Sequence, residues 1–305
     1  MLAIVIPYYK LTFFEDTLAS LAHQTDKSFK VYIGNDASPE DPLFLLNQYK
    51  GKFDFNYYKF ENNLGSKSLV KQWDRCLALI GQEEWIMLLC DDDTLSESCV
   101  ADFYKHLPKI NSTDCNVVRF ATLVKQMKPE KTSILYEHPE LEKATDFMYR
   151  RMTNSTRSSL SEYIFRKSMY LRYGFFDYLL GWHSDDRAWL EFSEFKYIYS
   201  INSAHVCFRL SEENISRSDF MIKEKNQSTL AFYNFVIFKH ILKFKRFQQK
   251  ELLFVYEQFI FKINKVNFSF SIRVFTLLVI NLYFIQSIKF ARRLLIHLNK
   301  DAYSS

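Results

Sequence analysis

The stretch from Ile86 to Thr94 constrains the fold more than any other part of the chain. An apolar run ends abruptly in Asp91, Asp92 and Asp93. Such a run is typical of a buried strand, and burying three adjacent carboxylates would cost several kcal/mol per ion. We therefore expect the strand to end at the open edge of a sheet, where a cation neutralises the carboxylates. The alternative is a solvated acidic turn that caps the next helix through Thr94 or Ser96.

The first 95 residues alternate between apolar runs and amphipathic segments. The patterns predict strands near residues 2–7, 29–33, 53–60 and 85–90, with helices near 14–22, 43–49 and 67–79 between them. This alternation predicts an α/β fold with a doubly wound, mostly parallel sheet, whose ligands bind at the carboxyl ends of the strands. Three predicted ends carry distinctive residues, at Pro7-Tyr8-Tyr9, Asn35-Asp36 and Asp91-Asp92-Asp93. Their convergence favours a functional site over a solvated turn.

Composition and charge divide the chain into two parts. The 305 residues are 48% hydrophobic and 25% charged, which excludes a disordered or fibrous protein. Residues 221–305 carry a net charge of +10 and residues 1–220 a net charge of −5. The strand–helix alternation also stops near residue 211. We expect a catalytic domain at 1–212, with a nucleotide-binding half at 1–95 and an acceptor-binding half at 96–212, and a basic, Phe-rich helical domain at 213–305.

The cysteines and the hydropathy of the chain indicate the cellular compartment in which the protein works. The five cysteines are scattered and form no Cys-x-x-Cys pair, which argues against a disulfide framework or a zinc site and suits a reducing cytosol. The first predicted strand begins at Leu2, which leaves no room for a signal peptide. No stretch reaches the roughly 20 apolar residues of a membrane span. These features predict a cytoplasmic protein.

Five motifs, met in order over about 200 residues, resemble those of the family 2 inverting glycosyltransferases of the GT-A fold. They are Ala3-Ile4-Val5-Ile6-Pro7-Tyr8-Tyr9, Gly34-Asn35-Asp36-Ala37-Ser38, Asn63-Leu64-Gly65 with Trp73-Asp74-Arg75-Cys76, Leu89-Cys90-Asp91-Asp92-Asp93, and Gly174-Phe175-Phe176-Asp177 with Ser184-Asp185-Asp186. The chain departs from the family pattern at Lys10, Asn35, Cys90 and Asp185.

The resemblance implies a nucleotide-sugar donor, with a UDP-sugar expected, and Mn²⁺ or Mg²⁺ as cofactor. Asp36 would accept the imide N–H of uracil, and Tyr9 would stack on the base. Asp93 would be the direct metal ligand, with Asp91 and Asp92 meeting the ribose or the ion through water. The implied nucleotide-binding set is Pro7, Tyr9, Asp36, Arg75, Asp91 and Asp92, and the implied metal ligands are Asp93 and Asp91.

The same resemblance implies the acid–base chemistry. Asp186 would be the general base that takes the proton of the acceptor hydroxyl, and Asp185 could substitute because the sequence does not show which carboxylate points inward. The alternative is a pair that caps the following helix. Arg157, within the polar segment 153–159, and Arg209 would contact the acceptor or the diphosphate. His183 and His205 are expected to be satisfied by hydrogen bonds rather than to bind metal.

The last predicted helix carries a stripe at Lys289, Arg292, Arg293, Ile296, His297 and Lys300 that is basic except for Ile296. A basic amphipathic helix suits an anionic membrane surface. The alternative is that the helix packs within a helical bundle or against a second subunit of a homo-oligomer, with its charges in solvent. We expect an enzyme that extends a glycan or a lipid-linked glycan at the inner face of a bacterial membrane. A catalytically inactive glycan-assembly scaffold is the alternative. A sugar-nucleotide pyrophosphorylase would need a Gly-rich loop after the first strand, and this chain has none there. Nucleic-acid binding is disfavoured because residues 1–220 are acidic overall.

Overall fold

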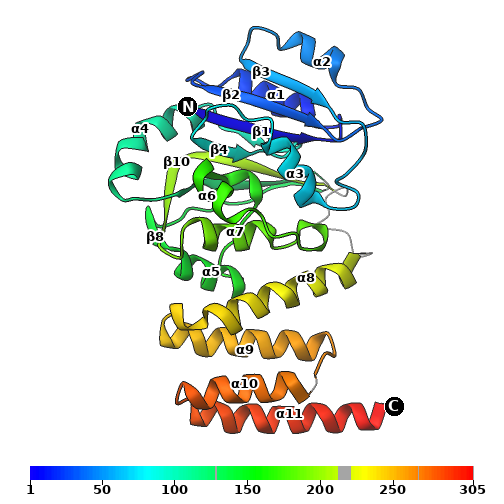
Figure 1. Cartoon of the computed structure of the whole chain (residues 1–305), viewed down its shortest axis with the longest axis vertical. Helices are drawn as coiled ribbons and strands as arrows, with labels where there is room; N and C mark the ends of the chain where they lie inside the picture. The colour runs from blue at the N-terminus through cyan, green and yellow to red at the C-terminus, as the bar shows by residue number, and fades with distance from the viewer. Residues whose placement is uncertain (128, 212–220, 267, 305) are drawn as a thin grey trace. The chain divides into compact units, whose positions relative to one another are not determined.

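The structure is a computed structural model that describes residues 1–127, 129–211, 221–266 and 268–304 (Figure 1). The chain divides into two compact units, Met1–Thr229 and Leu230–Ser305. The boundary predicted between residues 212 and 213 lies outside the described residues, so the predicted division into domains stays a prediction.

Four parallel strands form the first half of the sheet. They are β1 (Leu2–Tyr8), β2 (Phe29–Asn35), β3 (Asp54–Lys59) and β4 (Trp85–Leu88), in the spatial order β3-β2-β1-β4. β1 lies between two neighbours, and Leu2 pairs with Phe29 on one side and with Trp85 on the other. This central position explains why β1 is apolar at nearly every residue. The predicted α/β fold is confirmed.

Three helices connect these strands: α1 (Phe14–Ala22), α2 (Leu43–Gln48) and α3 (Leu69–Leu77). α1 packs on the sheet through Phe14, Leu18 and Leu21. α3 begins two residues later than its predicted start. The reason is its N-cap, because the Ser68 hydroxyl accepts a hydrogen bond from the Lys71 amide.

The second half of the sheet is mixed, in the order β4-β9-β6-β10-β5, which the sequence pattern did not predict. β9 (Tyr163–Arg166) is antiparallel to β4 and to β6 (Val117–Met127), and β10 (Tyr197–Leu210) is parallel to β6. The short strands are β5 (Thr94–Leu95), β7 (Glu130–Thr132) and β8 (Leu141–Lys143). This arrangement brings the start of β9 and the end of β10 to the carboxyl edge of β4.

The helices of this half are α4 (Cys99–Ser112), α5 (Ala144–Met152), η1 (Leu160–Glu162), α6 (Lys167–Tyr173), η2 (Leu179–Gly181) and α7 (Ser184–Phe192). α7 is fixed to the sheet by aromatic packing. The ring of Trp189 on α7 stacks on that of Tyr163 on β9, with the centroids 4.1 Å apart. The start of α7 is thereby tied to the same strand as η1.

The remaining elements are helical, as predicted: α8 (Ile222–Asn234), η5 (Phe235–Lys239), η6 (Ile241–Lys243), α9 (Arg246–Lys262), α10 (Phe268–Ile280) and α11 (Phe284–Ser304). In the second unit, Phe270 packs edge-on against Tyr256 and Phe290. Arg293 on α11 donates to both carboxylate oxygens of Glu257 on α9, at 2.5 and 2.7 Å. No helix among the described residues is both long enough and apolar enough to cross a membrane.

Candidate active site

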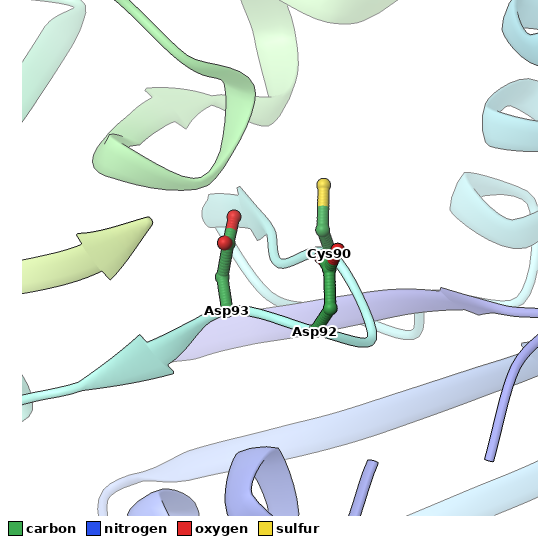
Figure 2. Close-up of side chains that lie close together, drawn as sticks. All are labelled: Cys90, Asp92 and Asp93. Carbon is green, nitrogen blue, oxygen red and sulfur yellow. The ribbon is translucent and has the colours of Figure 1, made fainter. Parts of the chain in front are cut away.

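The acidic turn lies directly after β4, at the carboxyl edge of the sheet. Figure 2 shows the side chains of Cys90, Asp92 and Asp93 projecting from this turn. The Cys90 sulfur and one carboxylate oxygen from each aspartate lie within 4.8 Å of one another. Cys90 is half-buried, as is Asp92, and Asp93 is fully buried.

Asp93 is held by groups from the two strands brought to this edge. One carboxylate oxygen accepts a hydrogen bond from the Ser161 hydroxyl at 2.6 Å, and the other accepts one from the Arg209 amide at 2.9 Å. Burial and the neighbouring charge of Asp92 nevertheless raise the pKa of Asp93 to about 8. The ionised carboxylate is therefore short of positive charge.

Asp91 ties the acidic turn to the loop after β1. Its carboxylate accepts hydrogen bonds from the amides of Tyr9 and Lys10, at 2.7 and 2.9 Å. Burial and the charge of Asp92 raise the pKa of Asp91 to about 6. The Thr17 hydroxyl on α1 lies 2.9 Å from the Asp93 carbonyl and 3.1 Å from that of Asp91. Two neighbouring segments thus fix the shape of the turn.

The donor atoms of the turn fit a divalent cation. Asp92 and Asp93 offer hard oxygen ligands, which Mg²⁺ and Mn²⁺ prefer. A carboxylate oxygen has two lone pairs, so each oxygen of Asp93 can accept one more partner besides its hydrogen bond. Burial and the nearby aspartates raise the pKa of Cys90 far above its usual range, which makes it a neutral thiol and a poor ligand for Mg²⁺.

A small pocket opens beside this turn. It is lined by Lys10, Thr12, Phe13, Asp91, Asp92 and Ser211. The loop after β1, the acidic turn and the end of β10 therefore meet around one hollow, which contains both signs of charge.

Asp36 and Arg75, predicted separately to bind nucleotide, form an ion pair with each other. The Asp36 carboxylate also accepts hydrogen bonds from the amides of Leu64 and Gly65, at 2.7 and 2.8 Å. Three of about four acceptor positions are thus used, which leaves one on Oδ2. The Arg75 guanidinium lies over the Phe60 ring, 4.0 Å from its centroid.

The other nucleotide-binding candidates lie on the loop after β1. Pro7 is half-buried near the end of β1, and the side chain of Tyr9 is 38% exposed. The ring of Tyr9 is therefore available to a ligand. Asn35 has a structural role, because its side chain donates to the Tyr57 hydroxyl and accepts from the Ser38 amide, both at 2.8 Å.

Asp185 and Asp186 lie in the first turn of α7 and differ sharply in their surroundings. Asp186 is buried and pairs with His183, whose Nδ1 lies 2.7 Å from a carboxylate oxygen, and with Arg151 at 3.4 Å. Burial alone would raise the pKa of Asp186, but Arg151 and His183 outweigh it and the net shift is downward. Asp185 is half-buried, and burial together with the charge of Asp186 raises its pKa to about 7.

His183 joins this pair from a strained backbone conformation. Its φ of 69° and ψ of 8° place it in the left-handed region, which non-glycine residues seldom adopt. Its ring is held on both sides, by Asp186 through Nδ1 and by the Thr229 hydroxyl, 3.1 Å from Nε2. The histidine is satisfied by hydrogen bonds, as expected. His183 fixes Asp186 rather than the half-buried Asp185.

The two arginines proposed for the acceptor or diphosphate have protein partners. Arg209 donates to the Asp92 carbonyl at 3.0 Å and to Asp16 at 2.7 Å. Arg157 lies 3.3 Å from the Glu162 carboxylate and over the Phe208 ring. The charge of Arg157 also lowers the pKa of Asp93 against the larger effects of burial and Asp92. Both arginines thus lie close to the acidic turn.

Several residues that shape the site were not predicted. Ser161 bonds Asp93 and also accepts from the Cys90 amide at 3.0 Å, and Arg151 pairs with Asp186. Thr17 completes this group. These are ordinary polar residues far from the motifs in sequence, and the spacing of the chain carries no signal for them. The mixed half of the sheet brings Ser161 to the acidic turn, whereas α1 brings Thr17 there.

The family follows from the sequence match that accompanies this geometry. Residues 3–178 match the model of glycosyl transferase family 2, which is more than half of the chain. The chain belongs to glycosyl transferase family 2. The resemblance drawn from the five motifs is confirmed, and so is the expectation of an enzyme, a glycosyltransferase.

Solved structures agree with a family 2 fold. The chain superposes on S. aureus TarS 1-349 in complex with UDP-GlcNAc with a TM-score of 0.54 and 16% identity, covering 85% of this chain and 80% of that one. The longer TarS structure gives a TM-score of 0.56 and 18% identity over 90% of this chain, which spans half of the length of that protein. At these identities the likeness shows the fold alone. A search of the curated proteins finds no match for this glycosyltransferase.

Proposed function

We propose that this glycosyltransferase moves a sugar from a UDP-sugar to a hydroxyl group of a glycan or lipid-linked glycan acceptor, with inversion at the anomeric carbon. The observation that carries the proposal is the buried Asp93 beside Asp92 at the pocket edge, where burial and the charge of Asp92 raise the pKa of Asp93 to about 8. The fold shared with TarS, solved with UDP-GlcNAc and with UDP, supports the choice of donor.

Asp92 and Asp93 would hold Mn²⁺ or Mg²⁺ together with the donor diphosphate. When bound, the ion supplies electrostatic stabilisation of the leaving diphosphate. Asp91 keeps the loop after β1 against the turn, through the Tyr9 and Lys10 amides. In this arrangement Asp91 would position the loop beside the pocket, and Asp92 and Asp93 would hold the cation.

The nucleobase would lie near Asp36 and Tyr9. Oδ2 of Asp36 retains one acceptor position for the imide N–H of uracil, and the exposed Tyr9 ring can stack on the base. Arg75 fixes the Asp36 carboxylate rather than meeting the nucleotide directly. Pro7 shapes the loop that carries Tyr9.

The general base is better assigned to Asp185 than to Asp186. A base works best when its pKa lies near the operating pH, and the pKa of Asp185 is about 7. Asp186 is already committed to Arg151 and His183, which lowers its pKa and its basicity. Asp185 would accept the acceptor proton through its carboxylate as the oxygen attacks the anomeric carbon. Asp186 would hold the start of α7 in place. This role resembles the alternative in which the aspartate pair caps the helix.

The acceptor would enter beside the segment at residues 153–159. Arg157 and Arg209 border the acidic turn from two elements, and both are anchored by carboxylates of the protein. We assign them to shaping the acceptor and diphosphate side of the site.

The test is a panel of nucleotide sugars supplied with Mn²⁺ or Mg²⁺. Release of nucleoside diphosphate and thermal protection by the same donor would support the proposal. Thermal protection with no turnover for any common donor and acceptor would instead support the inactive scaffold.

A further inference from the structure

The last two helices carry apolar side chains on both of their sides. α10 packs inward through a stripe at every fourth residue, formed by Phe270, Val274 and Leu278. Its opposite side exposes Ile272, Phe275 and Val279, at helical spacing. A helix with one packing partner is normally polar on the side that faces water. α10 therefore lacks one apolar neighbour.

α11 repeats the pattern. Ser287 and Phe290 are buried, whereas Ile285, Ile288 and Leu295 are exposed on the other side. α10 and α11 contact each other along their lengths and lie side by side in Figure 1. We use the name outer apolar face for six of the exposed apolar residues of the two helices: Ile272, Phe275, Val279, Ile285, Ile288 and Leu295.

The charges within this face have one sign. Lys289 and Arg292 are exposed on the same side of α11 as Ile288. The sequence from Val266 to Lys300 contains no aspartate or glutamate. The basic stripe predicted from the sequence is narrower than expected, because Arg293 turns to Glu257. The side chains of His297 and Lys300 lie outside the described residues.

We propose that the outer apolar face docks on an anionic lipid bilayer. Its apolar side chains would enter the boundary between headgroups and acyl chains, with Lys289 and Arg292 at the level of the lipid phosphates. The charge pattern decides the occupant. A second copy docked through the same face would present the same cations and no acidic side chain from residues 266–300 to complement them, whereas anionic headgroups complement both. This inference does not depend on the proposed glycosyl transfer.

The experiment is co-sedimentation of the full chain with vesicles. One set contains phosphatidylcholine alone, and the other contains equal parts of phosphatidylcholine and phosphatidylglycerol. We expect binding to the anionic vesicles that weakens with added salt, and little binding to the neutral ones. Each cation at such a surface contributes about fivefold, so Lys289→Gln with Arg292→Gln should weaken binding roughly 25-fold.

The apolar contribution is tested by Ile285→Ser with Ile288→Ser, which should also reduce binding at least tenfold. Both side chains are exposed, so Tm should stay unchanged. Matched controls in the first unit are Phe44→Ser, at a side chain that is 81% exposed, and Lys50→Gln; neither should affect binding.

Three results would overturn the proposal. The first is equal binding by the wild-type chain and the two double variants, and the second is no binding to anionic vesicles. The third is a wild-type dimer in sedimentation velocity that Ile285→Ser with Ile288→Ser converts to monomers, because a second copy would then occupy the outer apolar face.

Discussion

Asp185 and Asp186 are adjacent residues of one type with opposite chemistry. Arg151 and His183 stabilise the ionised form of Asp186, and the negative charge of Asp186 then acts on the half-buried Asp185. Asp186 is thus stabilised in its ionised form, whereas the pKa of Asp185 is raised to about 7. Pairs whose pKa values are pushed apart in this way are a common sign of acid–base function.

Asp185→Asn should lower the rate of sugar transfer by a factor on the order of 10²–10⁴, since the acceptor proton loses its base. In the wild-type enzyme, kcat/KM should rise with pH and level off above about 7, as Asp185 becomes ionised. The pH–rate profile of both proteins measures this. Asp186→Asn should instead lower Tm and move the rising limb to lower pH, because the variant loses the charge that helps to raise the pKa of Asp185. A wild-type profile that is flat between pH 5 and 8 would contradict the assignment.

Stability should respond to the same substitution with a defined sign. The folded state holds the Asp185 proton more tightly than the unfolded chain, whose pKa is near 3.8, so this group costs stability as pH rises from about 4 to about 7. Asp185→Asn removes that cost. The Tm of the variant relative to wild type should therefore increase over this interval and then level off, as measured by thermal unfolding at several pH values. A difference that falls over the same interval would argue against a raised pKa.

At the scale of elements, the site depends on where strands begin and end. η1 precedes β9, which runs antiparallel to β4, so Ser161 meets the turn that follows β4. β10 runs parallel to β6 and delivers the Arg209 amide to the same carboxylate. Asp93 is thus held by elements about 70 and 116 residues away in the chain.

Ser161→Ala should destabilise the protein by about 1–3 kcal/mol, because it removes the hydrogen-bond partner of the Cys90 amide and of one oxygen of the buried Asp93 carboxylate. Urea unfolding measures the change. Ser158→Ala, whose hydroxyl contacts Tyr163 at 3.1 Å, is the neighbouring control and should cost less. Equal losses would show that Ser161 has no special part in holding Asp93.

Gly65→Ala tests the close approach of the turn before α3 to Asp36. A Cβ at residue 65 would lie 2.5 Å from Oδ2 of Asp36, so the carboxylate or the turn must move. We expect a loss of about 1–3 kcal/mol in stability and weaker UDP binding by calorimetry. Gly51→Ala is the contrasting variant, because its Cβ meets no atom within 4 Å and the strain comes from its φ of 80° alone. Gly51→Ala should leave the affinity for UDP unchanged. If Gly65→Ala also binds UDP with wild-type affinity, Asp36 does not contact the nucleotide.

At the scale of the whole molecule, the sequence predicted what local patterns encode. Apolar runs and their polar ends were enough for the parallel half of the sheet and for the acidic turn after β4. The mixed half was not predictable, because strands such as β9 and β10 find their neighbours through contacts distant in sequence. For the same reason the ion pair of Asp36 with Arg75 and the contrast between Asp185 and Asp186 emerged only from the structure.

The most direct test of the whole account is the rate of UDP release from a UDP-sugar, measured with Mn²⁺ and with a chelator, for wild type and Asp93→Asn. The variant preserves the size of the side chain and an acceptor for the Arg209 amide, while it removes the charge and replaces the oxygen that faces Ser161 with an NH₂ group. We predict metal-dependent release by wild type, with at least a hundredfold loss in the variant (about 2.7 kcal/mol of transition-state stabilisation). Release that is equal in both proteins, or unaffected by the chelator, would contradict the account.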